Sequence, residues 1–414
     1  KWTIVHDRVR TCCTSPKRQR GPRWRFGLVC CRMARAGAAC LLTTAVLAIC
    51  TGCPPAPPLN QGKLPATSSL KSAEEPITAP LPIPDGLRNR VESAIDNVKQ
   101  RQLRTDNAFW TVFHGILGLG PDITLLDPET KKSVKAVDYI CAGGRLRGLE
   151  FFPTNDGLDV ATMKEMYLSQ GHQDQFIAEM TQWGMKPERK FVVNGKDYTF
   201  MDFIRHSKAR ASVKANQELS WAIIIIGQFF GTDCTWTNNL GEQLKFEDIV
   251  RYEMAQPIDD AACGGTHRLF GLSWVYQLHQ KRGGQKSGVW KEVAEHLAHY
   301  QQRAKELQNP DGSFSTEFFR KRANLDNMQQ RIYSTGHTLE WLAFSLPDAD
   351  LDKAWVQDAV SALSRMILEI RSDPMESGAI YHAVHGLILY HARVWEKDRH
   401  DPLKDIVPFP AKGS

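Results

Sequence analysis

Two kinds of helix-forming segment alternate along the chain from residue 87 onward. Residues 87–103 place four apolar side chains at helical spacing on one face, whereas 107–118 is apolar on nearly all sides. Later segments repeat this order, with a more polar segment before a more apolar one: 200–212 before 216–231, 244–255 before 263–280, 289–308 before 334–346, and 351–371 before 378–396. An amphipathic helix covers an exterior, and a helix apolar all round is enclosed by other elements.

This alternation predicts an all-α domain over residues 87–400. Exposed and enclosed helices in turn favour two concentric rings, an α/α toroid (α/α barrel) of helical hairpins. Five hairpins can be read from the pattern, and a sixth is expected within 157–184. The repeat is structural, because no strict sequence period accompanies it. The one clear strand pattern, at 190–200 around Asn194-Gly195, predicts a small β-hairpin insertion.

The first 86 residues have a different composition. Residues 1–32 are rich in arginine and cysteine and are interpreted as a leader that is either disordered or foreign to the native product. Residues 33–52 have the short positive start and apolar stretch of a signal peptide, and they end before Cys53. This resembles a bacterial lipoprotein signal, which implies lipidation of Cys53 and export to the periplasmic side of the cell envelope. Cys50 departs from that motif and leaves a plain secretory signal as the alternative.

Proline, serine, alanine and threonine dominate residues 53–86, which predicts an extended tether, and 401–414 is interpreted as a C-terminal tail. Ten Lys or Arg and one acid fall within residues 1–35, although the net charge of the whole chain is only +6. The remainder is therefore mildly acidic, which argues against a nucleic-acid partner. Only three cysteines follow Cys53, so a disulfide framework is not expected.

One turn sequence supports the toroid prediction. Residues 308–314, QNPDGSF, resemble the Gln-xxx-Gly-x-aromatic turn of the squalene-cyclase and prenyltransferase repeat superfamily, whose members are α/α toroids. The resemblance implies that Gln308, Gly312 and Phe314 join and brace helices. It covers one copy of the turn, and the acidic Asp-x-Asp-Asp motif of the cyclases is absent from the sequence.

A second short segment resembles a different group of α/α barrels. Residues 336–341, GHTLEW, are similar to the Gly-His-x-x-Glu-Trp segment of the N-acylglucosamine 2-epimerase-like sugar isomerases. The resemblance implies that His337 and Glu340 belong to a site. It spans six residues only.

Histidines near the expected starts of enclosed helices are the main candidates for chemistry. In a toroid these helix ends gather at one mouth, so His267, His337 and His382 are expected to converge beside positive helix ends that favour anions. Glu340 or Tyr381 would assist such a base. Arg268 would bind a carboxylate, and the remaining candidates would line the substrate site: Trp110, Trp221, Trp274, Trp341 and His385. The alternative is that these histidines cap helices and the tryptophans pack in the core.

No cofactor is expected from these residues, because proton abstraction beside a carbonyl or carboxylate needs no metal. Zinc is the alternative. Asp260, Cys263 and His267 have residue types that resemble the zinc ligands of the toroidal protein prenyltransferases, but their spacing differs and Gly264-Gly265 interrupts a helix between them.

These patterns predict an envelope-anchored lipoprotein with a central cavity, acting on a small molecule or saccharide as a carbohydrate-active isomerase or lyase. Two alternatives remain open. One is a non-catalytic binding or scaffold protein of the envelope. The other is a prenyltransferase-like or terpene-cyclase-like toroid acting on an isoprenoid. The cavity lining separates them, since a sugar enzyme needs convergent polar groups and an isoprenoid site needs a deep aromatic pocket.

Overall fold

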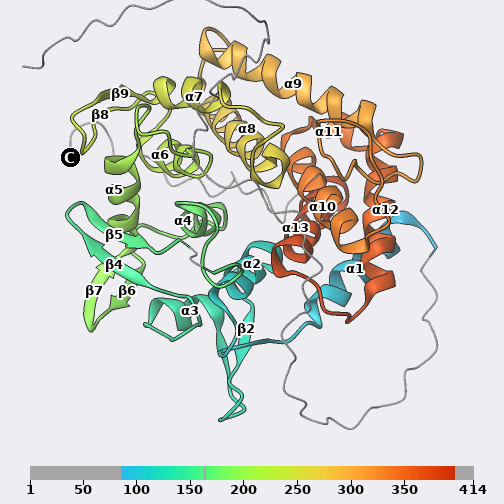
Figure 1. Cartoon of the computed structure of the whole chain (residues 1–414), viewed down its shortest axis with the longest axis horizontal. Coiled ribbons are helices and arrows are strands. Elements are labelled where there is room, and N and C mark those ends of the chain that lie inside the picture. Colours follow the sequence, from blue (N-terminus) through green and yellow to red (C-terminus); the bar gives the residue numbers. More distant parts are fainter. Residues whose placement is uncertain (1–84, 163–164, 397–414) are drawn as a thin grey trace, which may run out of the picture. The chain divides into compact units, whose positions relative to one another are not determined.

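The computed structural model describes residues 85–162 and 165–396, and the fold there is mainly helical, as the sequence predicts (Figure 1). The helices are α1 (Leu87–Lys99), α2 (Phe109–Leu119), α3 (Ala136–Cys141), α4 (Gln175–Gln182), α5 (Phe200–Arg210), α6 (Ala222–Phe230), α7 (Phe246–Met254), α8 (Thr266–Lys281), α9 (Val289–Leu307), α10 (Met328–Ser345), α11 (Asp348–Leu351), α12 (Ala354–Ile370) and α13 (Ser377–Trp395). The predicted leader, signal peptide, Cys53 and C-terminal tail lie outside these residues, as does nearly all of the tether. No helix in the described ranges is both long and apolar enough to cross a bilayer.

The expected hairpin at 190–200 is present. Strand β6 (Lys190–Val193) pairs antiparallel with β7 (Lys196–Thr199), and Asn194 and Gly195 adopt φ values of 52° and 74° between them. Two positive φ values in succession characterise the turn that suits a two-residue hairpin, and Asn-Gly adopts them at low cost.

Further small strands were not expected. The other strands are β1 (Leu103–Arg104), β2 (Thr124–Leu126), β3 (Ser133–Lys135), β4 (Phe151–Thr154), β5 (Gly157–Val160), β8 (Thr235–Thr237) and β9 (Gln243–Lys245). Each has two to four residues, too few to show a period-two pattern. The sequence thus predicted one of these hairpins and not the others. Within 157–184, where a sixth helical hairpin was expected, Gly157–Val160 forms β5, and the described residues contain one helix, α4, at the amphipathic segment.

A recurring unit appears in the first half of the fold. A hairpin connects an apolar helix to the following, more polar helix three times: β2–β3 joins α2 to α3, β6–β7 joins α4 to α5, and β8–β9 joins α6 to α7. Helices α2 and α6 are buried on nearly all sides, which accounts for their continuous apolar sequences.

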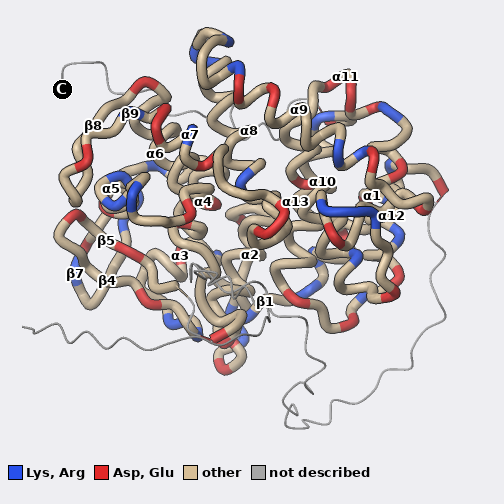
Figure 2. Tube along the Cα trace, turned by 45° about the horizontal axis from the view of Figure 1, so that its top comes forward, with Lys and Arg blue, Asp and Glu red and all other residues tan. Residues whose placement is uncertain are grey.

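Six helices contact one another in a closed cycle. Helix α2 contacts α4, α4 contacts α6, α6 contacts α8, α8 contacts α10, α10 contacts α13, and α13 contacts α2. The position of α13 between α2 and α10 can be followed in Figure 1. The more polar helices α3, α5, α7, α9 and α12 each contact a member of this cycle. Lys and Arg are interspersed with Asp and Glu along the described chain (Figure 2).

Glycines let α10 and α13 approach closely. A Cβ atom on Gly336 would lie 2.7 Å from Cβ of Ala383, and one on Gly386 would lie 2.8 Å from the backbone nitrogen of Glu340. These distances are too short for a side chain, so the two backbones are in direct contact. That contact sets the register that brings Glu340 opposite the histidines of α13.

The turn at 308–314 braces two helices. The Gln308 side chain donates hydrogen bonds to the carbonyl oxygens of Gly312, at 2.8 Å, and of Trp355 at the start of α12, at 2.7 Å. Gly312 has φ of 89°, and a Cβ atom there would lie 2.5 Å from the Asp358 carbonyl oxygen.

Gln308→Ala is therefore expected to destabilise the fold by about 1–3 kcal/mol, because two part-buried carbonyl groups lose their donor. Urea unfolding measures the change. The exposed Gln302 of α9, which bonds only to Glu306 one turn away, is the matched control, and Gln302→Ala should change stability by less than about 0.5 kcal/mol. Equal effects of the two substitutions would contradict the bracing role.

Candidate functional site

Three histidines from the three helices α8, α10 and α13 converge in the interior. The ring centroids of His267 and His337 are 5.4 Å apart, those of His267 and His382 are 5.3 Å apart, and those of His337 and His382 are 4.1 Å apart. Their exposed fractions are only 5%, 2% and 2%. The expected convergence is thus observed, but the three rings lie in a buried cluster.

The positions of these histidines along their helices differ from the expectation. His267 is the second residue of α8, near its start as predicted. His337 is not, because α10 begins at Met328, where the Asn327 side chain accepts a hydrogen bond from the Gln330 backbone. The polar residues before His337 therefore lie inside the helix, and the expectation of a helix start there is wrong. His382 lies more than one turn into α13.

The orientations of four imidazole rings are set by oxygen acceptors. His337 Nδ1 lies 2.8 Å from the Tyr333 carbonyl oxygen, and His114 Nδ1, on α2, lies 2.8 Å from the Trp110 carbonyl oxygen. His382 Nδ1 lies 2.7 Å from Glu340 Oε2. Carbonyl and carboxylate oxygens only accept, so each Nδ1 carries a proton, and in the neutral ring each Nε2 has the lone pair.

The fourth ring of this kind belongs to His172, in the segment before α4. Its Nδ1 lies 2.7 Å from Glu218 Oε2, so in the neutral form of this ring the proton is on Nδ1 and Nε2 has the lone pair. Burial by itself would lower the pKa of His172, but the Glu218 carboxylate and the Cys263 side chain outweigh burial and raise that pKa well above its ordinary value.

His267 differs from the other four rings. Both of its nitrogens are buried and have no hydrogen-bond partner. Its ring lies 4.9 Å from the ring of His172 and 4.8 Å from that of Trp221, as well as beside His337 and His382. A buried polar group without a partner costs free energy, so the environment of His267 calls for an explanation.

Cys263 lies at the edge of the cluster in an unusual backbone conformation. Cys263, Gly264 and Gly265 have φ values of 52°, 62° and 77°, three successive left-handed residues directly before α8. A left-handed cysteine is strained, and such strain is found at functional sites. Burial tends to raise the pKa of the Cys263 thiol, but the neighbouring imidazoles of His267, His337 and His172 outweigh burial and bring that pKa well below its ordinary value.

Buried carboxylates complete the cluster. Glu340 accepts hydrogen bonds from both His382 and His385, at 2.7 and 2.6 Å, and although burial raises its pKa, these two histidines lower the pKa overall. Glu179 of α4 accepts from Gln175, and its other oxygen has no partner. Burial therefore raises the pKa of Glu179 well above its ordinary range.

The two innermost histidines are held neutral. Burial, as the largest cause, lowers the pKa of His382 to about 4 against the opposing effect of Glu340. Burial and the nearby His382 also lower the pKa of His114 well below its ordinary value. Neutral imidazole is the form that binds a metal.

Three overlapping sets of side chains bring potential ligand atoms within 4.8 Å of one another. They are His172 with Cys263 and His267, His267 with His337 and His382, and His114 with Glu179 and His382. Of the three sequence-based metal candidates, Cys263 and His267 belong to these sets. Asp260 does not, since it is exposed and forms an ion pair with Arg320 at 3.1 Å.

Several predicted substrate-binding residues also lie near the cluster. The Trp110 ring lies 4.0 Å from that of His114 and donates its Nε1 hydrogen to Glu376 at 2.6 Å. Trp221 contacts His267, and its own Nε1 is buried without a partner. His385 shares Glu340 with His382.

Other predicted site residues have different surroundings. Trp274 packs against Phe344 with centroids 5.5 Å apart, and Trp341 donates to Ser273 Oγ at 3.0 Å. Arg268 forms a buried ion pair with Glu253 at 3.0 Å. These contacts are those of packed core side chains.

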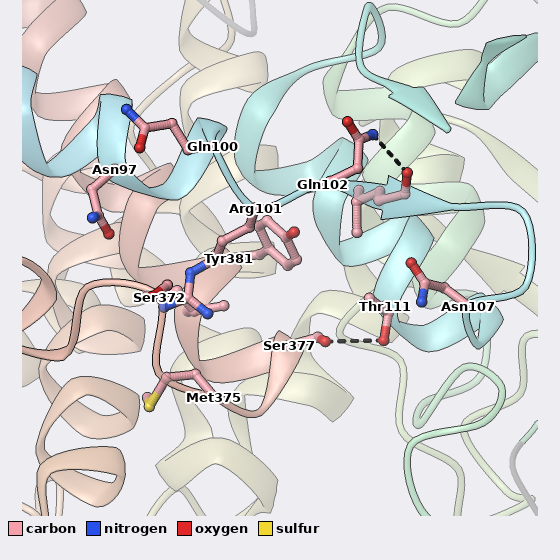
Figure 3. A pocket seen from close by; sticks show the side chains of 12 residues that line it. Asn97, Gln100, Arg101, Gln102, Asn107, Thr111, Ser372, Met375, Ser377 and Tyr381 are labelled. Carbon is pink, nitrogen blue, oxygen red and sulfur yellow. Dashed lines mark hydrogen bonds between the residues drawn. The ribbon is translucent and has the colours of Figure 1, made fainter. Parts of the chain in front are cut away.

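Tyr381 lines a hollow of about 430 Å³ whose lining includes none of the histidines (Figure 3). In that hollow it lies with Arg101, whose guanidinium donates to the Asp373 carbonyl oxygen at 3.0 Å. Burial raises the pKa of Tyr381 to about 12, so its phenol is neutral.

Sequence reasoning missed five residues of the cluster: His114, His172, Glu179, Glu218 and Tyr333. A polar residue inside an apolar helix was the available signal for His114 and Glu179. His172 and Glu218 lie outside helices and gave none.

Comparison of the chain with protein-family models, with curated protein sequences and with solved structures gave no match.

Proposed function

We propose that this protein is a metal-dependent enzyme whose metal ion is held by His267, His337 and His382. The observation that carries the proposal is the convergence of three buried imidazoles, of which His337 and His382 have Nδ1 fixed by an acceptor. Ligating histidines nearly always donate their other N–H to a carboxylate or carbonyl oxygen. The proposal replaces the sequence-based expectation that no cofactor is used.

The donor set fits a divalent transition metal, with zinc as the first choice. Imidazole and thiolate are zinc ligands, and a hard cation such as Mg²⁺ prefers oxygen. The ion would also give the otherwise unpartnered His267 a partner. Without a ligand, both buried nitrogens of His267 lack a partner, which is a costly arrangement for a stable core.

Three protein ligands favour catalysis over a purely structural role. Structural zinc sites close with four protein ligands, whereas catalytic sites keep a position for water or substrate. In such a position zinc activates water or polarises a carbonyl. His337 and His382 would orient the ion, Glu340 would hold His382 in its ligating tautomer, and Trp221 would cover one side of His267.

The finer architecture and cellular setting belong to the same proposal. We take the closed cycle of six helices as the inner layer of an α/α toroid, with the cluster inside it. The substrate would be a polar molecule such as a saccharide, handled by hydrolysis or elimination, because the cluster presents histidines, glutamates and Gln175. An isoprenoid site would need a deep aromatic pocket instead. Export and lipidation at Cys53 stay predictions from the sequence.

One arrangement favours a second candidate function. The arrangement has a nucleophile in Cys263, a base in His172 and an orienting carboxylate in Glu218. His172 and Glu218 form a hydrogen bond of 2.7 Å, and the strained cysteine lies just before a helix. This geometry is that of a thiol enzyme for acyl transfer. In that case Cys263 would be alkylated rapidly by iodoacetamide whether or not metal is present. As a neighbour of the metal, it would be protected in the loaded protein.

Metal analysis of the full chain tests the proposal. We expect the wild-type protein, purified without chelator, to carry at least one equivalent of zinc or a related metal. Inductively coupled plasma mass spectrometry measures the metal content. His337→Ala should weaken metal binding by more than about 100-fold, because loss of even an outer-shell partner costs about 10–100-fold. His299→Ala, at an exposed position of α9, is the control and should bind like wild type. A folded wild-type protein that does not bind these metals would contradict the proposal.

A further inference from the structure

His267 lies where two of the potential ligand sets meet. It belongs to the set with His337 and His382, and also to the set with His172 and Cys263. Its ring contacts the rings of His337 and His382 at 5.4 and 5.3 Å, and that of His172 at 4.9 Å. One imidazole thus contacts the histidines of both ligand sets.

The hydrogen bonding of His267 sets it apart from a ligand of a single metal ion. His337 and His382 use one ring nitrogen for an acceptor and keep the other for the metal. Neither nitrogen of His267 has such a partner, although both are buried. An imidazole that binds one ion would normally donate its second N–H to an oxygen acceptor. Both nitrogens of His267 are therefore available as ligand atoms.

The second set has the chemistry of a metal site in its own right. Cys263 offers a thiolate, which would offset part of the charge of a divalent ion. His172 offers Nε2, since its Nδ1 donates to Glu218 at 2.7 Å in the same way that His382 donates to Glu340. Both ligand sets thus include a histidine whose ring is oriented by a carboxylate.

We infer that the cluster binds two divalent transition-metal ions bridged by the imidazolate of His267. One ion is held by His267, His337 and His382, and the second by His267, His172 and Cys263. This inference rests on the metal centre under Proposed function and adds a second ion to it. The Cys263 sulfur binds as the thiolate, and forming the bridge releases the remaining N–H proton of His267 to solvent.

Metal stoichiometry separates this inference from the function on which it rests. The full chain is stripped with a chelator, titrated with Zn²⁺ and freed of unbound metal. Two equivalents per chain support the inference. One equivalent overturns it but leaves the single-ion centre standing, including the case of one ion shared by all five side chains. Binding of no metal overturns both.

Variants assign the second position. His172→Ala and Cys263→Ser are expected to reduce the stoichiometry from two ions to one, while His299→Ala keeps two. Circular dichroism checks that each variant is folded. If one of the two variants does not fold, the other still tests the assignment. Two ions retained in both folded variants would overturn the assignment.

The bridge itself has a spectroscopic signature. In protein loaded with two Cu²⁺ ions, an imidazolate bridge couples the unpaired electrons, so the spins counted by electron paramagnetic resonance at low temperature should fall well below the copper content. A spin count equal to the copper content in the two-ion protein at neutral pH would overturn the bridge.

Discussion

Replacing Glu340 by glutamine is expected to damage both the metal centre and the fold. Glu340 is buried between α10 and α13 and accepts hydrogen bonds from His382 at 2.7 Å and from His385 at 2.6 Å. The amide of glutamine has only one oxygen, so one of its two sides would present N–H groups to an imidazole N–H. To avoid this clash an imidazole must change tautomer, and His382 would then carry its proton on Nε2, the proposed ligand atom.

The expected result of Glu340→Gln is an approximately 10–100-fold loss of metal affinity and a loss of about 1–3 kcal/mol in stability. Competition with a fluorescent chelator measures the affinity, and urea unfolding of the metal-free protein measures the stability. Glu369→Gln is the control, because Glu369 is exposed on α12. Unchanged metal affinity in a folded Glu340→Gln protein would contradict the role given to Glu340.

Removal of the metal is expected to produce a large change in stability. An ion that binds only the folded state stabilises it by about 4 kcal/mol when its free concentration is about 1,000 times the dissociation constant. In the metal-free protein, both buried nitrogens of His267 also lack a hydrogen-bond partner. Chelation should therefore lower the thermal midpoint by several degrees, and added Zn²⁺ should restore it.

Differential scanning calorimetry with and without chelator measures this effect. His337→Ala provides the matched comparison, because a protein that cannot hold the ion should show the same midpoint under both conditions. An unchanged wild-type midpoint, under conditions where metal analysis confirms that the ion has been removed, would contradict a stabilising metal centre.

The helical framework could be predicted because its signal is local. Apolar positions at helical spacing identify most of the helices to within a few residues, and Asn194-Gly195 identifies the β6–β7 hairpin. The remaining hairpins have strands of at most four residues, which are too short to leave a periodic pattern. The start of α10 was misplaced because Ser334 and Thr335 look like capping residues, whereas the cap is Asn327.

The site could be predicted only in part. His267, His337 and His382 were predicted to converge because they were expected at the starts of enclosed helices, although only His267 lies near such a start. Their partners depend on tertiary structure. Glu340 reaches His382 and His385 because Gly336 and Gly386 let α10 and α13 pack backbone to backbone, and no local pattern encodes that register. His172 and Glu218 lie in connecting segments and come together only in the folded chain.

Anomalous X-ray diffraction from crystals of the metal-loaded full chain tests the central claim most directly. Data collected on both sides of the zinc absorption edge locate the ion without reference to activity. The account predicts an anomalous difference peak among the Nε2 atoms of His337 and His382 and a ring nitrogen of His267. Density for these three side chains with no anomalous peak among them, and with water or protein groups bonded to His267 instead, would contradict it.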